Sequence, residues 1–185
     1  MFFIATFFLS KSQMGVYNYI SSAVLLLVIF SDFGISTSTS RYIALYNVKD
    51  KDSVKRVFFN SFLMIFIISF VVITLALLLR ETFFKEYSQY IPYALPMVFI
   101  TPMTSLLDGM YRGLKRFKTL SIVSLLNSLV GIILSYVFVS SWGLEGAILA
   151  QVGYFSIYTI TLLVLHTEYE FKIEKKILRD IGRYA

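Results

Sequence analysis

The sequence contains no cysteine, so it offers neither a disulfide framework nor a thiolate metal site. Charge is also scarce: only 15% of the residues are Asp, Glu, Lys or Arg, whereas 57% are hydrophobic. A soluble domain carries about 25% charged residues, because its surface must face water. These proportions favour a chain whose solvent is largely the lipid bilayer.

Motifs for common enzyme chemistry are missing as well. The sequence has no Walker loop, no GxSxG, no HExxH and no cysteine pair. Its single histidine, His166, falls at the expected inner end of a helix, where it would serve as an interfacial anchor. Glu81, Glu86 and Glu145 are the acids available on the expected outer side, and they are weak material for acid/base catalysis. We therefore expect no enzyme, no cofactor and no metal.

Five nearly uncharged stretches are long enough to cross about 30 Å of hydrocarbon, which takes roughly 20 helical residues. They are 12–31, running on to about 40, then 57–79, 91–107, 119–142 and 146–165. Residues 1–10 form a short sixth stretch, since ten helical residues rise only about 15 Å. We expect an all-α, polytopic transmembrane helix bundle of six spans, the first of them truncated. Barrel strands are a poor alternative because 62–79 is apolar at almost every position.

Basic residues collect in every second connection between these stretches. Fourteen of the 17 Lys and Arg residues lie in 41–56, in 112–118 and in the tail at 172–183. Because Lys and Arg favour cytoplasmic loops, we expect a multi-pass protein of the cell membrane with both ends of this chain cytoplasmic. The net charge of +6 has the same explanation, so we expect no nucleic-acid partner.

The pattern changes near residue 171. Ile173, Ile177, Leu178, Ile181 and Tyr184 are spaced as one face of a helix, with charged residues between them. This spacing predicts a cytoplasmic amphipathic helix at 171–185 that follows a transmembrane lobe at 1–170. We expect this helix to be a linker to further membrane helices; a terminal amphipathic anchor is the alternative.

Acidic residues near the membrane are the most informative polar groups, because they usually face a cavity or a partner. Asp32 is followed on its helical face by Ser36, Thr39 and Ser40. This stripe either lines a wet cavity or binds neighbouring helices through its hydroxyls. Arg41 lies about 180° around the helix from Asp32, so the two should not pair within one helix. It is either an interfacial anchor or a substrate contact.

A second polar group lies in the fourth stretch. Asp108 and Arg112 stand four residues apart with the acid first, the order that favours a helical ion pair. All three prolines fall near them, and Pro102 should leave the carbonyl of Val98 without its helical donor and kink the helix. In transporters, irregular helices often border the pathway.

Small residues recur at close-packing spacing in the last two stretches, as at Gly131 with Ser135 and at Gly146 with Ala150. This spacing predicts that two helices pack tightly against each other. Asn127 and Gln151 are placed to bridge helices across that seam.

Several motifs resemble those of a known family. They are QMGVY at 13–17, SDFGI at 31–35 leading to RYIA at 41–44, DGMYRGLKRF at 108–117 and WGLEGA at 142–147. Their order and spacing resemble the polysaccharide flippases, the O-antigen and capsule exporters of the multidrug, oligosaccharidyl-lipid and polysaccharide exporter superfamily. The resemblance extends over nearly all 185 residues.

This resemblance implies two six-helix lobes around a central cavity, with the present chain as the first lobe and the second lobe as its partner. In such flippases a lipid-linked oligosaccharide, carrying a pyrophosphate, moves from the inner to the outer leaflet by alternating access. A cationic cavity would suit that anion. The residues expected along the pathway are Asp32, Ser36, Arg41, Asp108 and Arg112. The expected partners are the lipid-linked oligosaccharide and membrane lipids.

Three other functions stay open. A multidrug or metabolite exporter of the same superfamily would take a soluble organic cation in place of a lipid-linked sugar. An enzyme of glycan assembly, such as a polymerase or acyltransferase, would need larger outer loops or intramembrane clusters of His and acids. A non-transporting membrane scaffold predicts that neutralising Asp32 and Arg112 leaves function intact.

Overall fold

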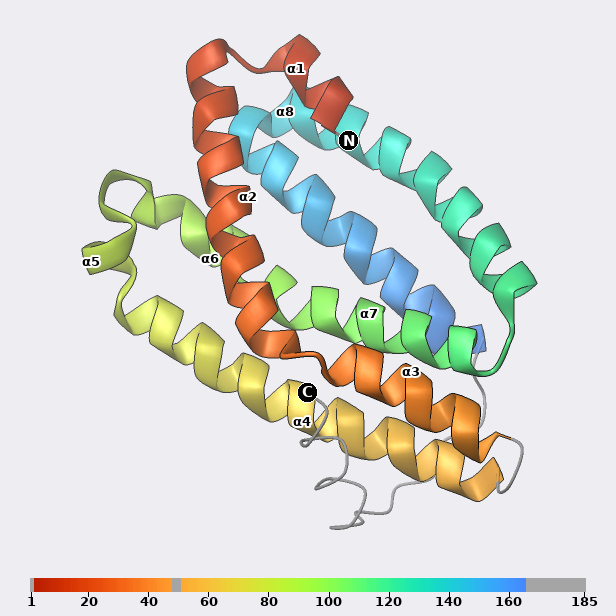
Figure 1. The fold of residues 1–185 in the computed structure, drawn as a ribbon. Coiled ribbons are helices and arrows are strands. Elements are labelled where there is room, and N and C mark those ends of the chain that lie inside the picture. The colour runs from red at the N-terminus through yellow and green to blue at the C-terminus, as the bar shows by residue number, and fades with distance from the viewer. Residues whose placement is uncertain (1, 48–50, 166–185) are drawn as a thin grey trace.

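The computed structural model describes residues 2–47 and 51–165, and within these ranges the chain is helical and contains no strand (Figure 1). In chain order the elements are α1 (Phe2–Phe8), α2 (Lys11–Asp32), α3 (Ile35–Tyr46), α4 (Lys51–Leu78), α5 (Arg80–Phe83), the 3-10 helix η1 (Lys85–Tyr90), α6 (Ile91–Ala94), α7 (Met97–Gly113) and α8 (Phe117–Leu165). The expected all-α fold class is confirmed. The amphipathic helix predicted at 171–185 and the predicted anchor His166 lie outside the described residues.

Four helices in the described ranges are long and apolar enough to cross a membrane, namely Lys11–Asp32, Ser53–Leu78, Tyr87–Gly113 and Phe117–Leu165. The last has 49 residues and would measure about 74 Å if straight, more than twice the hydrocarbon thickness. It divides at Gly143, where φ is 54° and ψ is −123°, and its two parts lie side by side (Figure 1). Because α1 has only seven residues, an arrangement of six spans remains a prediction.

Small residues allow the two parts of α8 to pack closely. A Cβ atom at Gly146 would stand 1.9 Å from the carbonyl oxygen of Phe138. At Gly131 it would stand 2.6 Å from the ring of Tyr154, and the Asn127 amide donates to the Tyr154 carbonyl at 3.3 Å. The tight packing expected at Gly131 and Gly146 is confirmed, as is the bridging role of Asn127.

The helix expected to run from residue 12 to about residue 40 is interrupted, which corrects that expectation. Phe33 and Gly34 both have left-handed backbone, with φ of 42° and 78°. The N–H of Phe33 donates to the carbonyl of Ile29 and ends α2, and α3 starts at Ile35. Glycine adopts positive φ without strain, whereas Phe33 does so at a cost that the surrounding structure must offset.

The prolines act at two places. The regular helix is interrupted at Leu95 and Pro96, between α6 and α7, while Pro102 lies inside α7. As expected, Pro102 leaves the carbonyl of Val98 to another donor. The buried hydroxyl of Ser69 on α4 supplies that donor at 3.2 Å. This bond ties α4 to the proline-containing helix.

Replacing Ser69 by alanine should leave the Val98 carbonyl buried without this donor. We expect S69A to lower the free energy of unfolding by about 1–3 kcal/mol, the usual cost of a buried polar group that loses its partner. Thermal denaturation in detergent micelles measures the change. T74A is the matched control on the same helix, because the exposed Thr74 hydroxyl donates to the Phe70 carbonyl of α4 itself. Equal melting temperatures for S69A and T74A would contradict the role of Ser69.

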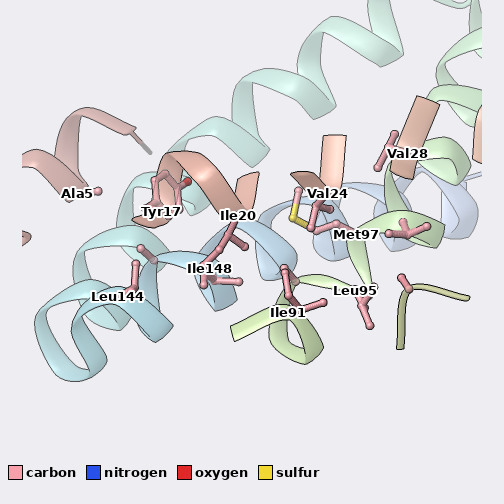
Figure 2. Packing of buried hydrophobic residues seen from close by; sticks show 14 of the residues in the cluster. Ala5, Tyr17, Ile20, Val24, Val28, Ile91, Leu95, Met97, Leu144 and Ile148 are labelled. Carbon is pink, nitrogen blue, oxygen red and sulfur yellow. The ribbon is translucent and has the colours of Figure 1, made fainter. Parts of the chain in front are cut away.

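Two clusters of buried hydrophobic residues lie toward opposite ends of the bundle. The first includes Tyr17 and Ile20 of α2, Ile91 of α6 and Ile148 of α8 (Figure 2). The second joins α3, α4, α7 and α8, where α3 packs against both α7 and α4. Between helices in lipid, such packing acts mainly through van der Waals contact. This packing fixes the position of α3 relative to α7.

Candidate functional site

A cavity of about 540 Å³ lies between the end of α2, α3 and α7. The five residues expected along a pathway all line it: Asp32, Ser36, Arg41, Asp108 and Arg112. The other lining residues are Thr37, Ser40, Ala44, Ser105, Gly109 and Gly113. Two polar groups that are far apart in the sequence therefore share one cavity.

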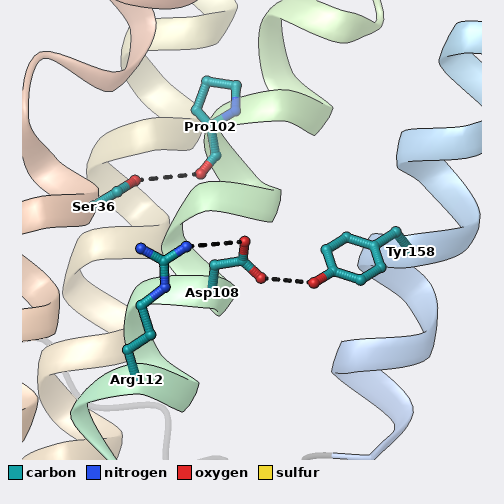
Figure 3. A network of polar contacts seen from close by, with 5 residues as sticks. All are labelled: Ser36, Pro102, Asp108, Arg112 and Tyr158. Carbon is teal, nitrogen blue, oxygen red and sulfur yellow. Dashed lines mark hydrogen bonds and ion pairs between the residues drawn. The ribbon is translucent and has the colours of Figure 1, made fainter. Parts of the chain in front are cut away.

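Asp32 is the last residue of α2, and its carboxylate caps the next helix. Oδ1 accepts a hydrogen bond from the backbone N–H of Ser36 at 3.2 Å and another from the Ser36 hydroxyl. The first N–H groups of a helix have no acceptor within it, and a negative charge is favourable there. The Ser36 hydroxyl also lies 3.5 Å from the carbonyl oxygen of Pro102 (Figure 3). Asp32 thus fixes the first turn of α3 beside α7.

The polar stripe expected along α3 divides between two neighbours. Ser36 and Ser40 line the cavity beside α7. Thr39 faces α4 instead, where its hydroxyl lies 2.6 Å from the hydroxyl of Ser61. Ser36 and Ser40 therefore line a cavity, while the hydroxyls of Ser36 and Thr39 also join α3 to α7 and to α4.

Gly109 and Gly113 bring α3 close to α7, and neither was predicted from the sequence. A Cβ atom at Gly109 would stand 2.8 Å from the carbonyl oxygen of Ser36. One at Gly113 would stand 2.8 Å from the carbonyl oxygen of Ser40 and 2.9 Å from Cγ2 of Ile43. The two glycines stand four residues apart on one helical face, the spacing that permits close helix approach in membranes and the signal that identifies them. They set the distance between the two walls of the cavity.

Asp108 is the centre of a polar network (Figure 3). Its Oδ2 lies 3.7 Å from Nη2 of Arg112, so the predicted ion pair is present. Tyr158 of α8, which was not predicted, donates its hydroxyl to Oδ1 of Asp108 at 3.0 Å. The Arg112 side chain is 62% exposed, and exposed ion pairs contribute only about 0–1 kcal/mol. Arg112 can therefore exchange Asp108 for another anion at little cost.

Arg41 is an exposed residue of α3 that lines the same cavity as Arg112. Two guanidinium groups in one cavity suit an anion, because each can form paired hydrogen bonds with a carboxylate or a phosphate. Among the side chains that the structure describes, no three of His, Cys, Asp or Glu gather as a metal ion would require. The two arginines make anion binding one chemistry available to the described cavity.

Comparison with known proteins follows the resemblance in the motifs. A family model described as polysaccharide biosynthesis protein matches residues 1–184, which include both walls of the cavity. No curated protein and no solved structure matches significantly. Four apolar helices long enough to cross a membrane, together with this match, make the chain a membrane protein. The chain belongs to the family of polysaccharide biosynthesis proteins.

Proposed function

We propose that this chain is part of a flippase that exports lipid-linked oligosaccharide across the cytoplasmic membrane by alternating access. The observation that supports this most is the cavity that Arg41 of α3 shares with Arg112 of α7, beside two helices, α2 and α7, that are apolar enough to span a membrane. Arginine is rare within membrane segments and usually marks the path of a substrate or ion. Transport, rather than catalysis, is the proposed activity.

An anionic head group explains why such a cavity is needed. A pyrophosphate that enters hydrocarbon loses its hydration, which costs far more than a membrane helix can otherwise offset. Guanidinium groups and hydroxyls replace the lost water with charge-assisted hydrogen bonds. Arg41, Arg112 and the hydroxyl of Ser105 provide both kinds of group in one cavity.

The two aspartates make the binding reversible. Asp32 and Asp108 line the cavity with Arg41 and Arg112, so the formal charges balance. A transported anion must bind well enough to enter and weakly enough to leave. When a phosphate binds Arg112, Asp108 keeps its hydrogen bond from Tyr158. The ion pair of Asp108 with Arg112 then forms again after the phosphate leaves.

The cavity lies beside the basic connections of the chain, which membrane proteins place in the cytoplasm. We therefore propose that it receives its lipid-linked substrate from the inner leaflet. Both ends of the chain lie in the cytoplasm in this arrangement. Membrane lipids and a second transmembrane lobe are the other proposed partners.

Complementation tests the proposal. The full reading frame of the gene, expressed in a bacterium that lacks its own flippase, is expected to restore surface polysaccharide. Failure to restore it, with membrane insertion confirmed, would contradict the proposed export. Increased resistance to soluble organic cations in the same strain would then favour the multidrug exporter.

A substitution at Asp32 distinguishes the proposed transporter from a non-transporting scaffold. Asparagine keeps an oxygen that can accept both bonds from Ser36, so D32N removes the charge and preserves the cap of α3. With one repulsive charge removed, D32N should bind polyprenyl pyrophosphate roughly two- to fivefold more tightly and export less polysaccharide, because release slows. A binding assay and the complementation strain measure the two effects. Unchanged export in D32N at equal protein level would support the scaffold.

A further inference from the structure

The cavity of about 540 Å³ that Asp32, Arg41, Asp108 and Arg112 line is hereafter the charged cavity. The faces of α2 and α7 that line it continue toward the other end of the bundle. On α2 the face is formed by Ser21, Leu25, Val28 and Asp32. On α7 it is formed by Met97, Thr101, Ser105, Asp108 and Arg112. Tyr158 of α8 donates to Asp108, and Phe155 and Gln151 lie one and two turns before Tyr158 on the same side of α8. Steps of three and four residues keep each set on one side of its helix. The same surface of α2 and of α7 is therefore shared by the charged cavity and the region beyond it.

A second cavity, of about 220 Å³, lies along this surface. None of its lining residues is charged; they are Ser21, Ser22, Val24, Leu25, Val28, Met97, Thr101, Gln151 and Phe155. Hydroxyls, one amide and one aromatic ring thus line a neutral cavity. Thr101 and Asp108 are seven residues apart on α7, about 10 Å along the helix axis. One molecule with a charged part and a neutral part can reach both cavities.

Thr101 is the feature of the neutral cavity that calls for a ligand. Its Oγ1 is buried and has no hydrogen-bond partner in the part of the chain that the structure describes. Other threonines form a hydrogen bond within their own helix. The hydroxyls of Thr39, Thr74 and Thr104 each donate to the carbonyl four residues earlier. Thr101 does not use the equivalent carbonyl of Met97. An unpartnered buried hydroxyl destabilises the protein unless something binds it.

Gln151 and Phe155 supply the other contacts. The hydroxyl of Tyr17 donates to Oε1 of Gln151 at 3.0 Å, which orients the amide and leaves its nitrogen to donate elsewhere. Phe155 presents an aromatic ring, whose negative face attracts the weakly positive C–H groups of a sugar ring. Hydroxyl, amide and ring together suit a neutral ligand that is rich in hydroxyls.

We propose that the neutral cavity is a subsite for the first sugar of the exported molecule, occupied while the pyrophosphate lies in the charged cavity. This inference rests on the proposed function. The volume of about 220 Å³ is below the roughly 300–1,000 Å³ of pockets for drug-sized ligands, so the subsite takes one sugar ring and not a whole oligosaccharide. Thr101 and Gln151 bind sugar hydroxyls there.

Two probes and one isosteric substitution test the subsite. The probes are polyprenyl pyrophosphate and the same lipid carrying a single N-acetylhexosamine, bound to protein made from the full reading frame. T101V should lower the affinity for the sugar-bearing lipid about fivefold, because one hydrogen bond is lost. Its affinity for the bare lipid should be unchanged. T101S should restore wild-type affinity. T74V is the matched control, because the exposed hydroxyl of Thr74 lies outside both cavities.

The thermal stability of T101V distinguishes a binding role from a structural one. Removing an unpartnered buried hydroxyl should leave the melting temperature of the free protein equal to that of wild type or above it. Equal affinities of T101V and wild type for the sugar-bearing lipid would overturn the subsite and leave the proposed function standing. An equal loss of affinity of T101V for both lipids would also overturn the subsite. A wild-type protein that binds neither probe would overturn the proposed function and the subsite together.

Discussion

Neutralising both cavity arginines in R41Q/R112Q is expected to weaken the binding of polyprenyl pyrophosphate about a hundredfold or more. A hydrogen bond to a charged group contributes about 1.5–3 kcal/mol, and each tenfold change in affinity corresponds to about 1.4 kcal/mol. Glutamine keeps an apolar stem and a hydrogen-bond donor, so the change is mainly one of charge. Binding of the lipid to protein in detergent micelles measures the effect, and surface polysaccharide in the complementation strain should fall with it.

The matched control for R41Q/R112Q is K115Q/K118Q. Lys115, in the connection after α7, and Lys118, the second residue of α8, are exposed and do not line the cavity. Both double variants lose two positive charges, so general attraction of an anion to this end of the protein falls equally. Such attraction is also screened by salt, whereas binding inside a cavity is screened much less. Equal losses of affinity in the two variants would contradict a site formed by Arg41 and Arg112.

G146A should have the largest effect on stability. A Cβ atom at residue 146 would stand 1.9 Å from the carbonyl oxygen and 2.5 Å from the carbonyl carbon of Phe138. Both neighbours are backbone atoms that no side-chain rotation can move aside, so the two parts of α8 must separate. We expect a loss of about 3 kcal/mol or more, at the upper end of overpacking effects. The fraction of monodisperse protein that remains after heating in detergent measures it.

Gly153 offers the control within the same part of α8. A Cβ atom at Gly153 would meet only Cδ1 of Leu134, at 3.7 Å, which is ordinary contact. Because alanine forms helix better than glycine, G153A should be neutral or stabilise the protein by up to about 1 kcal/mol. If the same fraction of G146A and G153A stays monodisperse after heating, close packing at residue 146 does not stabilise the hairpin of α8.

The positions of the long helices follow from the sequence because hydrocarbon imposes a minimum length on any span. The reversal at Gly143 was expected between two apolar stretches, and the ion pair of Asp108 with Arg112 follows from helical geometry alone. These features depend on residues that are close in the sequence. Local spacing therefore sufficed to predict them.

Several contacts between residues far apart in the sequence were not predicted. The sequence indicates that the Val98 carbonyl loses its donor, but only the packing of α4 on α7 identifies Ser69 as the replacement. Tyr158 reaches Asp108 from a helix 50 positions further along the chain. No repeat or motif links such pairs, because helix packing in three dimensions brings them together.

The break at Phe33 and Gly34 had a local signal that was outweighed. Gly34 comes two residues after Asp32, an arrangement in which the glycine adopts a left-handed backbone and the acid caps the next helix. The uncharged run on both sides of it favoured one continuous helix. Because the break lies beside the cavity, it places Asp32, Ser36 and Arg41 on the cavity wall, although a straight helix would put Asp32 and Arg41 on opposite sides.

Translocation across a sealed bilayer is the most direct test of the central claim that this cavity moves lipid-linked oligosaccharide. Protein from the full reading frame is reconstituted into vesicles loaded with polyprenyl pyrophosphate-linked oligosaccharide, and the sugar that reaches the opposite leaflet is measured with a membrane-impermeant lectin. We expect protein-dependent exposure of the sugar that is retained in K115Q/K118Q and lost in R41Q/R112Q. Exposure as fast in R41Q/R112Q as in wild type, or none with folded wild-type protein, would contradict the proposed transport through this cavity.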